Sequence, residues 1–133
     1  MPSSTSRADV RRFLLDFKRA ATSATSKKAQ VWSRAKNRDA PLDLGLSERQ
    51  RDDVLLALQP EDYVAGPLPD DDPAWGGDVW VFGACVHGED VYIKLKLAGV
   101  EPLQHAVCIS FHKAERELSF PFRNATHQGD APS

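Results

Sequence analysis

The sequence predicts an α+β fold, in which two or three N-terminal helices pack on one face of a C-terminal antiparallel sheet. Apolar residues recur at helical spacing in the first half of the chain and at alternate positions in the second half. The length of 133 residues suits a single domain. Helices on one face of such a sheet leave the other face open, so we expect function on that open face.

Two helices are expected in the N-terminal half. The first covers about residues 7–21, because Ser6 can cap its start and apolar residues follow every three or four positions. The second covers about residues 48–58 and ends at Pro60. Residues 61–63 are expected to add one more helical turn.

The strands are expected later in the chain, where the apolar period changes to two. Residues 66–78 are dense in Gly, Pro and Asp, which excludes a regular element there. We expect a short extended segment at 30–33, three strands at 79–86, 91–97 and 106–111, and a fourth strand at 118–122. Residues 1–6 and 124–133 are expected to be disordered, which leaves one domain over residues 7–123.

The net charge of −2 hides an uneven distribution along the chain. Residues 1–38 hold ten Lys or Arg and two Asp or Glu, residues 39–90 hold two and thirteen, and residues 91–133 hold five and four. This asymmetry favours a polyanion or a charged protein as partner. The alternative is that both charged segments are ordinary solvated surfaces.

Several classes of protein are excluded or disfavoured by the composition. No apolar run approaches the roughly 20 residues that cross a bilayer, so we expect no membrane partner. The first ten residues do not resemble a signal peptide, so we expect a cytoplasmic protein. In that compartment Cys85 and Cys108 are expected to be free thiols.

The expected strand pairing gathers polar side chains on the open face. In the first hairpin we expect Val86 to pair with Val91. In the second we expect three pairs: Tyr92 with His112, Lys94 with Ser110, and Lys96 with Cys108. Neighbours across strands lie about 5 Å apart, so these polar side chains would be close enough to act on one ligand.

These residue types match the needs of RNA cleavage without a metal. Such cleavage needs a base for the 2′-hydroxyl, an acid for the leaving oxygen and cations for the phosphate. Tyr92 and His112 are the acid and base candidates, and Lys94 joins them as a catalytic candidate. The candidates for phosphate binding are Lys96, Lys113, Arg116 and Arg123.

The same residues have two other interpretations. Lysines that alternate with apolar residues are also typical of any solvent-facing strand. Two cysteines and two histidines (Cys85, His87, Cys108 and His112) suggest zinc. However, the four-residue spacing of Cys108 and His112 separates them by about 13 Å along a strand, too far for one ion. No metal and no cofactor are therefore expected.

A series of sequence blocks resembles the motility quorum-sensing regulator (MqsR) toxin family of bacterial toxin–antitoxin systems. The blocks occur in one order over about residues 8–123: Arg34-Ala35-Lys36-Asn37, Leu44-Gly45-Leu46, Leu58-Gln59-Pro60-Glu61-Asp62-Tyr63, Gly66-Pro67, Asp78-Val79-Trp80-Val81-Phe82-Gly83, Gly88, Val91-Tyr92-Ile93-Lys94-Leu95-Lys96 and Ile109-Ser110-Phe111-His112. The resemblance implies a RelE-like fold, metal-independent cleavage of mRNA and a cognate antitoxin.

The resemblance also bears on single residues. Tyr92 and Lys94 occupy the tyrosine and lysine positions of the family's V-Y-x-K block. The chain departs from the family at Val64-Ala65 in place of a lysine, at Val81 in place of a glutamine, and at His112 in place of a lysine. These departures move the expected acid–base chemistry toward His112.

Together the residues and the resemblance predict a toxin-type mRNA interferase that leaves a 2′,3′-cyclic phosphate and a 5′-hydroxyl. Its expected partners are mRNA, a cognate antitoxin and, as one option, the ribosome. The alternative function is a non-catalytic module that binds RNA or an acidic protein through its basic surface. A third option is that the apolar edge or the open sheet serves only to dock a partner protein.

Overall fold

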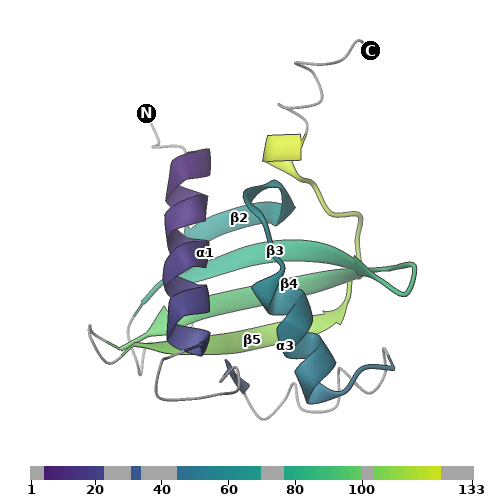
Figure 1. Cartoon of the computed structure of the whole chain (residues 1–133). Helices are drawn as coiled ribbons and strands as arrows, with labels where there is room; N and C mark the ends of the chain where they lie inside the picture. The colour runs from purple at the N-terminus through teal and green to yellow at the C-terminus, as the bar shows by residue number, and fades with distance from the viewer. Residues whose placement is uncertain (1–4, 23–30, 34–44, 70–76, 100–103, 124–133) are drawn as a thin grey trace.

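The computed structural model describes residues 5–22, 31–33, 45–69, 77–99 and 104–123 (Figure 1). Of the start that the sequence predicts as disordered, only Thr5 and Ser6 are described, and Ser6 caps the first helix. The predicted disordered tail over residues 124–133 lies outside the described residues.

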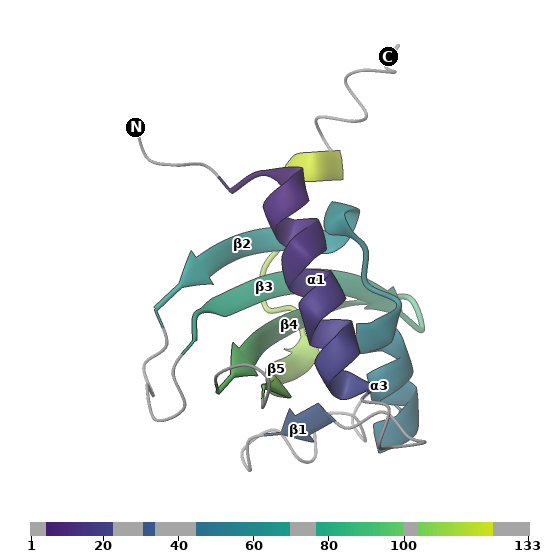
Figure 2. The ribbon, with the colours of Figure 1, turned by 60° about the vertical axis from the view of Figure 1, so that its left-hand side comes forward.

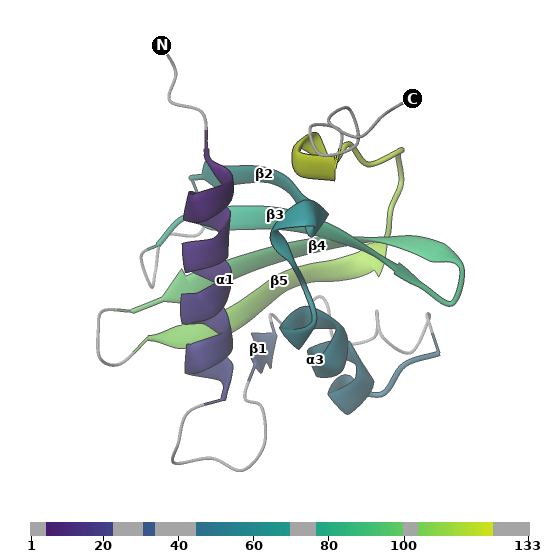
Figure 3. The same cartoon turned by 45° about the horizontal axis from the view of Figure 1, so that its top comes forward.

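The predicted α+β class is confirmed, with a sheet in the order β1-β5-β4-β3-β2. The sheet is antiparallel except at β1, which runs parallel to β5. Its strands are β1 (Val31–Ser33), β2 (Tyr63–Leu68), β3 (Val79–Val86), β4 (Glu89–Ala98) and β5 (His105–Lys113). Figure 3 shows α1 and α3 on the same side of the sheet.

The first helix, α1 (Arg7–Ala21), matches its predicted bounds. Ser6 and Asp9 form the capping box at its start, and its apolar residues are buried. Phe13 stacks on Trp80 of β3, with ring centroids 4.7 Å apart, so α1 packs directly on the sheet (Figure 2). No helix in the described part of the chain is long and apolar enough to cross a membrane.

The second helix, α3 (Glu48–Leu56), ends two residues before its predicted end. The extra helical turn follows as the 3₁₀ helix η2 (Pro60–Asp62). Lys18 of α1 donates a hydrogen bond to the carbonyl oxygen of Leu58 at 2.7 Å, which joins α1 to the segment between α3 and η2. Leu58 is buried, so this junction belongs to the core.

The hairpin of β3 and β4 turns more tightly than the sequence suggests. His87 and Gly88 both have positive φ, as the two-residue turn that favours a right-twisted hairpin requires. Val86 consequently pairs with Glu89, and the predicted pairing of Val86 with Val91 is wrong by two residues. A shift of two keeps every side chain on its predicted face.

The pairing of β4 with β5 contains an irregularity that the sequence does not reveal. Tyr92 pairs with His112 and Lys94 with Ser110, as predicted. The register then shifts between Lys94 and Leu95, so that Leu95 pairs with Cys108. Ile109 is the extra residue of this bulge, and the predicted pair of Lys96 with Cys108 is wrong.

The edge strand β2 overlaps, at residues 66–68, the segment that the sequence excluded from regular structure. Tyr63–Leu68 pairs with β3 with two register shifts, and it contains Gly66 and Pro67. Proline is tolerated here because an edge strand need not donate every backbone hydrogen bond. The exclusion of residues 66–78 is therefore wrong at 66–68, and residues 70–76 lie outside the described residues.

The predicted fourth strand at 118–122 is wrong. Residues 114–123, here named the strap, follow β5 without forming a strand, although the Ala114 N–H donates a hydrogen bond to the Asp90 carbonyl oxygen, and they finish in a helical turn at 121–123 (Figure 3). A Cβ atom placed on Gly83 would lie 2.6 Å from Leu118 Cδ1 and 2.8 Å from Phe120 Cζ. The strap thus covers β3 on the face that was expected to be open.

Candidate functional site

Tyr92 and His112 form the centre of the candidate site. They are paired residues on β4 and β5, and their rings stack with centroids 5.2 Å apart and planes 26° apart. Both side chains are half-buried, so each ring is held by the sheet while part of it faces solvent. The structure therefore brings together the two acid–base candidates that the sequence singles out.

The hydrogen bond of His112 determines which ring nitrogen is available. Nδ1 lies 2.9 Å from the carbonyl oxygen of Lys113. A carbonyl oxygen can only accept, so Nδ1 carries the proton of this bond. In the neutral ring the lone pair is consequently on Nε2, which is the arrangement that a general base requires.

Burial favours the protonated form of Tyr92. Removal of the phenol from water raises the pKa of Tyr92 above its ordinary value of 10.0. No compensating charge offsets this effect. Tyr92 is therefore a proton donor at neutral pH and a poor base.

Lys94 and Ser110 form the next row of the same surface. They are paired across β4 and β5, two residues from Tyr92 and His112, and both are half-buried. Strand alternation places their side chains on the face that carries the aromatic pair. A phosphate that contacts the rings is thus within reach of one ammonium group and one hydroxyl.

Lys96 does not belong to the accessible surface. Its relative exposure is 2%, so the prediction that it lies on an open face with Tyr92 is wrong. A Cβ atom on Gly77 would lie 3.7 Å from Lys96 Cε, which places the segment before β3 against the lysine stem. Strand alternation correctly predicts on which face of the sheet Lys96 lies. It does not reveal that the segment before β3 covers Lys96 on that face.

The three remaining predicted phosphate ligands lie in different surroundings. Lys113 is exposed, but strand alternation directs it away from the face of His112. Arg116 is exposed on the strap. Arg123 is already engaged, since its guanidinium contacts Asp62 at 2.7 Å and lies 3.9 Å from the centre of the Phe120 ring.

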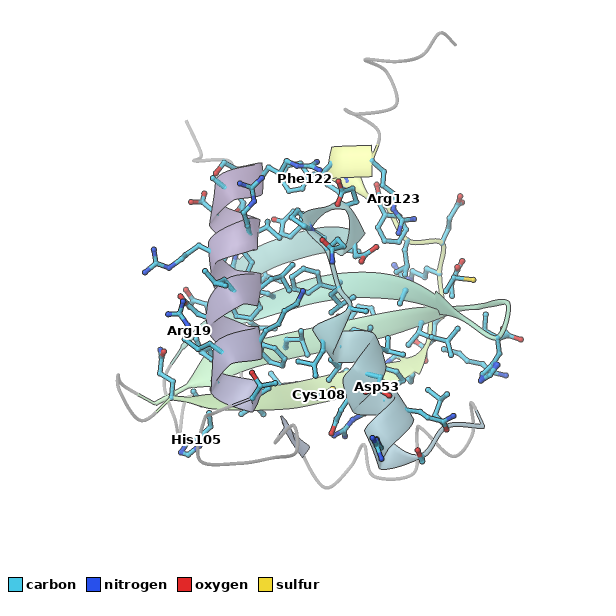
Figure 4. All side chains as sticks on the ribbon, viewed as in Figure 1. Arg19, Asp53, His105, Cys108, Phe122 and Arg123 are labelled. Atoms are coloured by element: carbon cyan, nitrogen blue, oxygen red, sulfur yellow. The ribbon has the colours of Figure 1, made fainter. Side chains whose placement is uncertain are left out.

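The strap forms an apolar wall beside the aromatic pair. Gly83 lies directly opposite Tyr92, and Leu118 and Phe120 occupy the space where a side chain on Gly83 would be. Figure 4 shows Phe122 and Arg123 at the far end of the strap. The sequence offers one signal for this wall, a glycine within an otherwise apolar strand.

The two cysteines differ in environment. Cys85 is exposed, whereas Cys108 is 1% exposed in the core beneath α3 (Figure 4). Burial raises the pKa of the Cys108 thiol to about 12, which leaves it unreactive. Within the described ranges, no three His, Cys, Asp or Glu side chains gather closely enough to hold a metal ion.

A groove of about 680 Å³ lies on the opposite face of the sheet, between α1 and β2. Its walls include Trp80, Leu68 and the carboxylates of Asp9 and Asp16. The guanidinium of Arg12 also lines the groove but pairs with Asp16, so the net charge of the lining is negative, which repels phosphate and does not suit RNA. The arrangement around Tyr92 and His112 therefore remains the better candidate for RNA chemistry.

The fold and this arrangement define an α+β domain that carries a tyrosine, a histidine and a lysine on one sheet face. Nothing among protein-family models, curated proteins or solved structures matches the chain. The resemblance to the MqsR family therefore stays a prediction.

Proposed function

We propose that the chain is a metal-independent endoribonuclease of the toxin type, with a RelE-like arrangement of helices on a sheet. The observation that carries the proposal is the stack of Tyr92 on His112. It combines a phenol that stays protonated with an imidazole whose Nδ1 is hydrogen-bonded and whose Nε2 is free to act as base.

Nε2 of His112 takes the proton of a ribose 2′-hydroxyl, and the 2′-oxygen attacks the adjacent phosphorus. The bond from phosphorus to the 5′-oxygen breaks, and the Tyr92 hydroxyl gives its proton to that oxygen. The products are a 2′,3′-cyclic phosphate and a 5′-hydroxyl. Protons balance, since one is taken by His112 and one is supplied by Tyr92.

Lys94 stabilises the negative charge that builds on the phosphate oxygens during this step. Arg116 is exposed on the strap after β5, where it attracts the flanking RNA backbone, whereas Lys113 is left out because strand alternation directs it to the other face. Lys96 and Arg123 are left out of the proposed site, because the first is buried and the second is bound to Asp62.

The resemblance supports the rest of the proposal. It suggests mRNA as substrate and a cognate antitoxin as protein partner, and the proposal also takes the cytoplasm as compartment and the ribosome as an optional partner in cleavage. The experiment is incubation of the purified chain with mRNA in EDTA, with and without ribosomes, followed by analysis of product ends. We expect fragments with 2′,3′-cyclic phosphate and 5′-hydroxyl ends.

A substrate with 2′-deoxynucleotides at the cut positions is the matched control, and it should remain intact. Failure of the chain to cut RNA under either condition would refute the enzyme. RNA binding that weakens steeply with salt and yields no product would favour the non-catalytic module instead.

A further inference from the structure

The exposed side of α1 combines a leucine with arginines. Leu15 is 50% exposed, and the only other described large hydrophobic side chain that is exposed is Leu68, at 43%. Leu15 borders a notch of about 140 Å³ between α1 and the segment that joins α3 to η2. The notch, here named the α1 notch, is lined by Arg11, Leu14, Leu15, Lys18, Leu58, Gln59 and Pro60.

Two cations line the α1 notch. Arg11 is exposed and forms no ion pair with any described residue. Lys18 has its ammonium on the Leu58 carbonyl. Arg12 and Arg19 share the carboxylate of Asp16, at 3.1 and 4.0 Å, and do not line the notch, and Figure 4 shows Arg19 on the side of α1 that faces away from α3. No Asp or Glu is among the residues that line the notch, so its charge is positive.

We propose that the α1 notch docks an acidic protein segment through one aliphatic side chain of leucine or methionine size. The small apolar notch suits one such anchor, and the exposed half of Leu15 adds apolar surface for its neighbours. Arg11 and Lys18, which line the notch, then face the acidic residues that flank the anchor. Charge complementarity and the apolar notch thus select the same class of partner.

An RNA backbone matches the charge of this surface and not its shape, because phosphates have no apolar group to fill the notch or to bury Leu15. The surface also lies on the opposite side of the sheet from Tyr92 and His112, so a bound segment leaves that site uncovered. The inference is thus independent of the proposed nuclease activity.

The test uses a short labelled peptide of glutamates in which leucines recur at helical spacing, with binding followed by fluorescence anisotropy. We expect the full chain to bind this peptide and Leu15→Ser to weaken binding about tenfold. Arg11→Gln should weaken binding and flatten its salt dependence. Leu68→Ser, a matched change of an exposed leucine elsewhere, should leave the affinity unchanged.

Four results would overturn the proposal. In the first two, the chain fails to bind the peptide, or it binds equally well a peptide in which serines replace the leucines. In the third, an RNA oligonucleotide binds through Arg11 and Leu15→Ser leaves its affinity unchanged, which would assign this surface of α1 to nucleic acid. In the fourth, light scattering detects a dimer that Leu15→Ser dissociates, which would make a second copy of the chain the occupant of the notch. Circular dichroism of each variant separates these results from a loss of folding.

Discussion

At the scale of single residues, the environments of Tyr92 and His112 divide the acid and base roles between them. Tyr92 is kept protonated by burial, and His112 is oriented by its bond to the Lys113 carbonyl. The variant Tyr92→Phe keeps the ring that stacks on His112 and removes only the proton donor. We expect the single-turnover rate of RNA cleavage to fall about 100-fold while RNA affinity is unchanged.

The pH profile provides a second readout for Tyr92. The donor must be protonated, and burial raises the pKa of Tyr92 above 10.0, so the alkaline fall in rate should begin above that value. Tyr92→Phe should abolish this limb. An unchanged alkaline limb in the variant would show that another group supplies the proton.

Cys108 predicts a loss of stability at alkaline pH. Its folded-state pKa is about 12, against 9.0 for an unperturbed thiol, so the folded protein holds a proton that the unfolded chain releases. The free energy of unfolding should therefore fall between pH 9 and 12 by about 1.4 kcal/mol per pH unit from this group. Denaturant titrations should show a shallower fall in Cys108→Ala.

Cys85→Ala is the matched control, because Cys85 is an exposed thiol of the same sheet. Its alkaline fall in stability should equal that of the original chain. Equal slopes for Cys85→Ala and Cys108→Ala would contradict the account of the buried thiol.

The pairing of Tyr92 with His112 could be predicted because both strands alternate and their registers follow from the buried face. The burial of Lys96 could not be predicted, because alternation assigns a side chain to one face of the sheet without indicating what packs over that face. The ion pair of Arg123 could not be predicted either, since its partner Asp62 lies 61 residues earlier in the chain. Long-range partners of charged side chains leave no periodic signal.

At the scale of elements, the strap depends on the absence of a side chain at Gly83. Gly83→Ala would place a methyl group 2.6 Å from Leu118 Cδ1 and 2.8 Å from Phe120 Cζ, so the ends of these two side chains must shift. We expect a loss of about 1–3 kcal/mol in the free energy of unfolding, measured by chemical denaturation. Faster proteolysis of residues 114–123 should accompany it.

A double variant tests the contact itself. Gly83→Ala combined with Leu118→Ala should cost less than the sum of the single changes by at least about 0.5 kcal/mol, since the second change makes room for the first. Ser119→Ala, an exposed position of the strap, should show no such coupling. Strict additivity for Leu118→Ala would mean that the strap does not rest on Gly83.

The elements with strong local signals were predicted to the residue. The helix over 7–21 has a capping box and a regular apolar face, and the strand over 79–86 is apolar on both faces. The strap resembles a strand in the sequence because Leu118, Phe120 and Phe122 alternate, but in the structure these side chains are half-buried and the segment pairs with no strand. β2 was missed because glycine and proline are turn formers that an edge strand tolerates.

At the scale of the whole molecule, ion pairs within the chain partly compensate the uneven distribution of charge. Arg7 at the start of α1 pairs with Glu61, and Arg123 at the end of the strap pairs with Asp62. The acidic turn η2 therefore joins the two ends of the described chain. Exposed cations remain on α1, on α3 at Arg49, and near the end of β5 at Lys113 and Arg116.

The central claim is that Tyr92 and His112 form the acid–base pair of an RNA-cleaving site. The most direct measurement is the single-turnover rate of mRNA cleavage in EDTA by the original chain, His112→Ala and the exposed control Lys113→Ala. The account predicts cleavage by the original chain, a fall of at least about 100-fold in His112→Ala, and a fall of less than about tenfold in Lys113→Ala. Equal rates for the original chain and His112→Ala would contradict it.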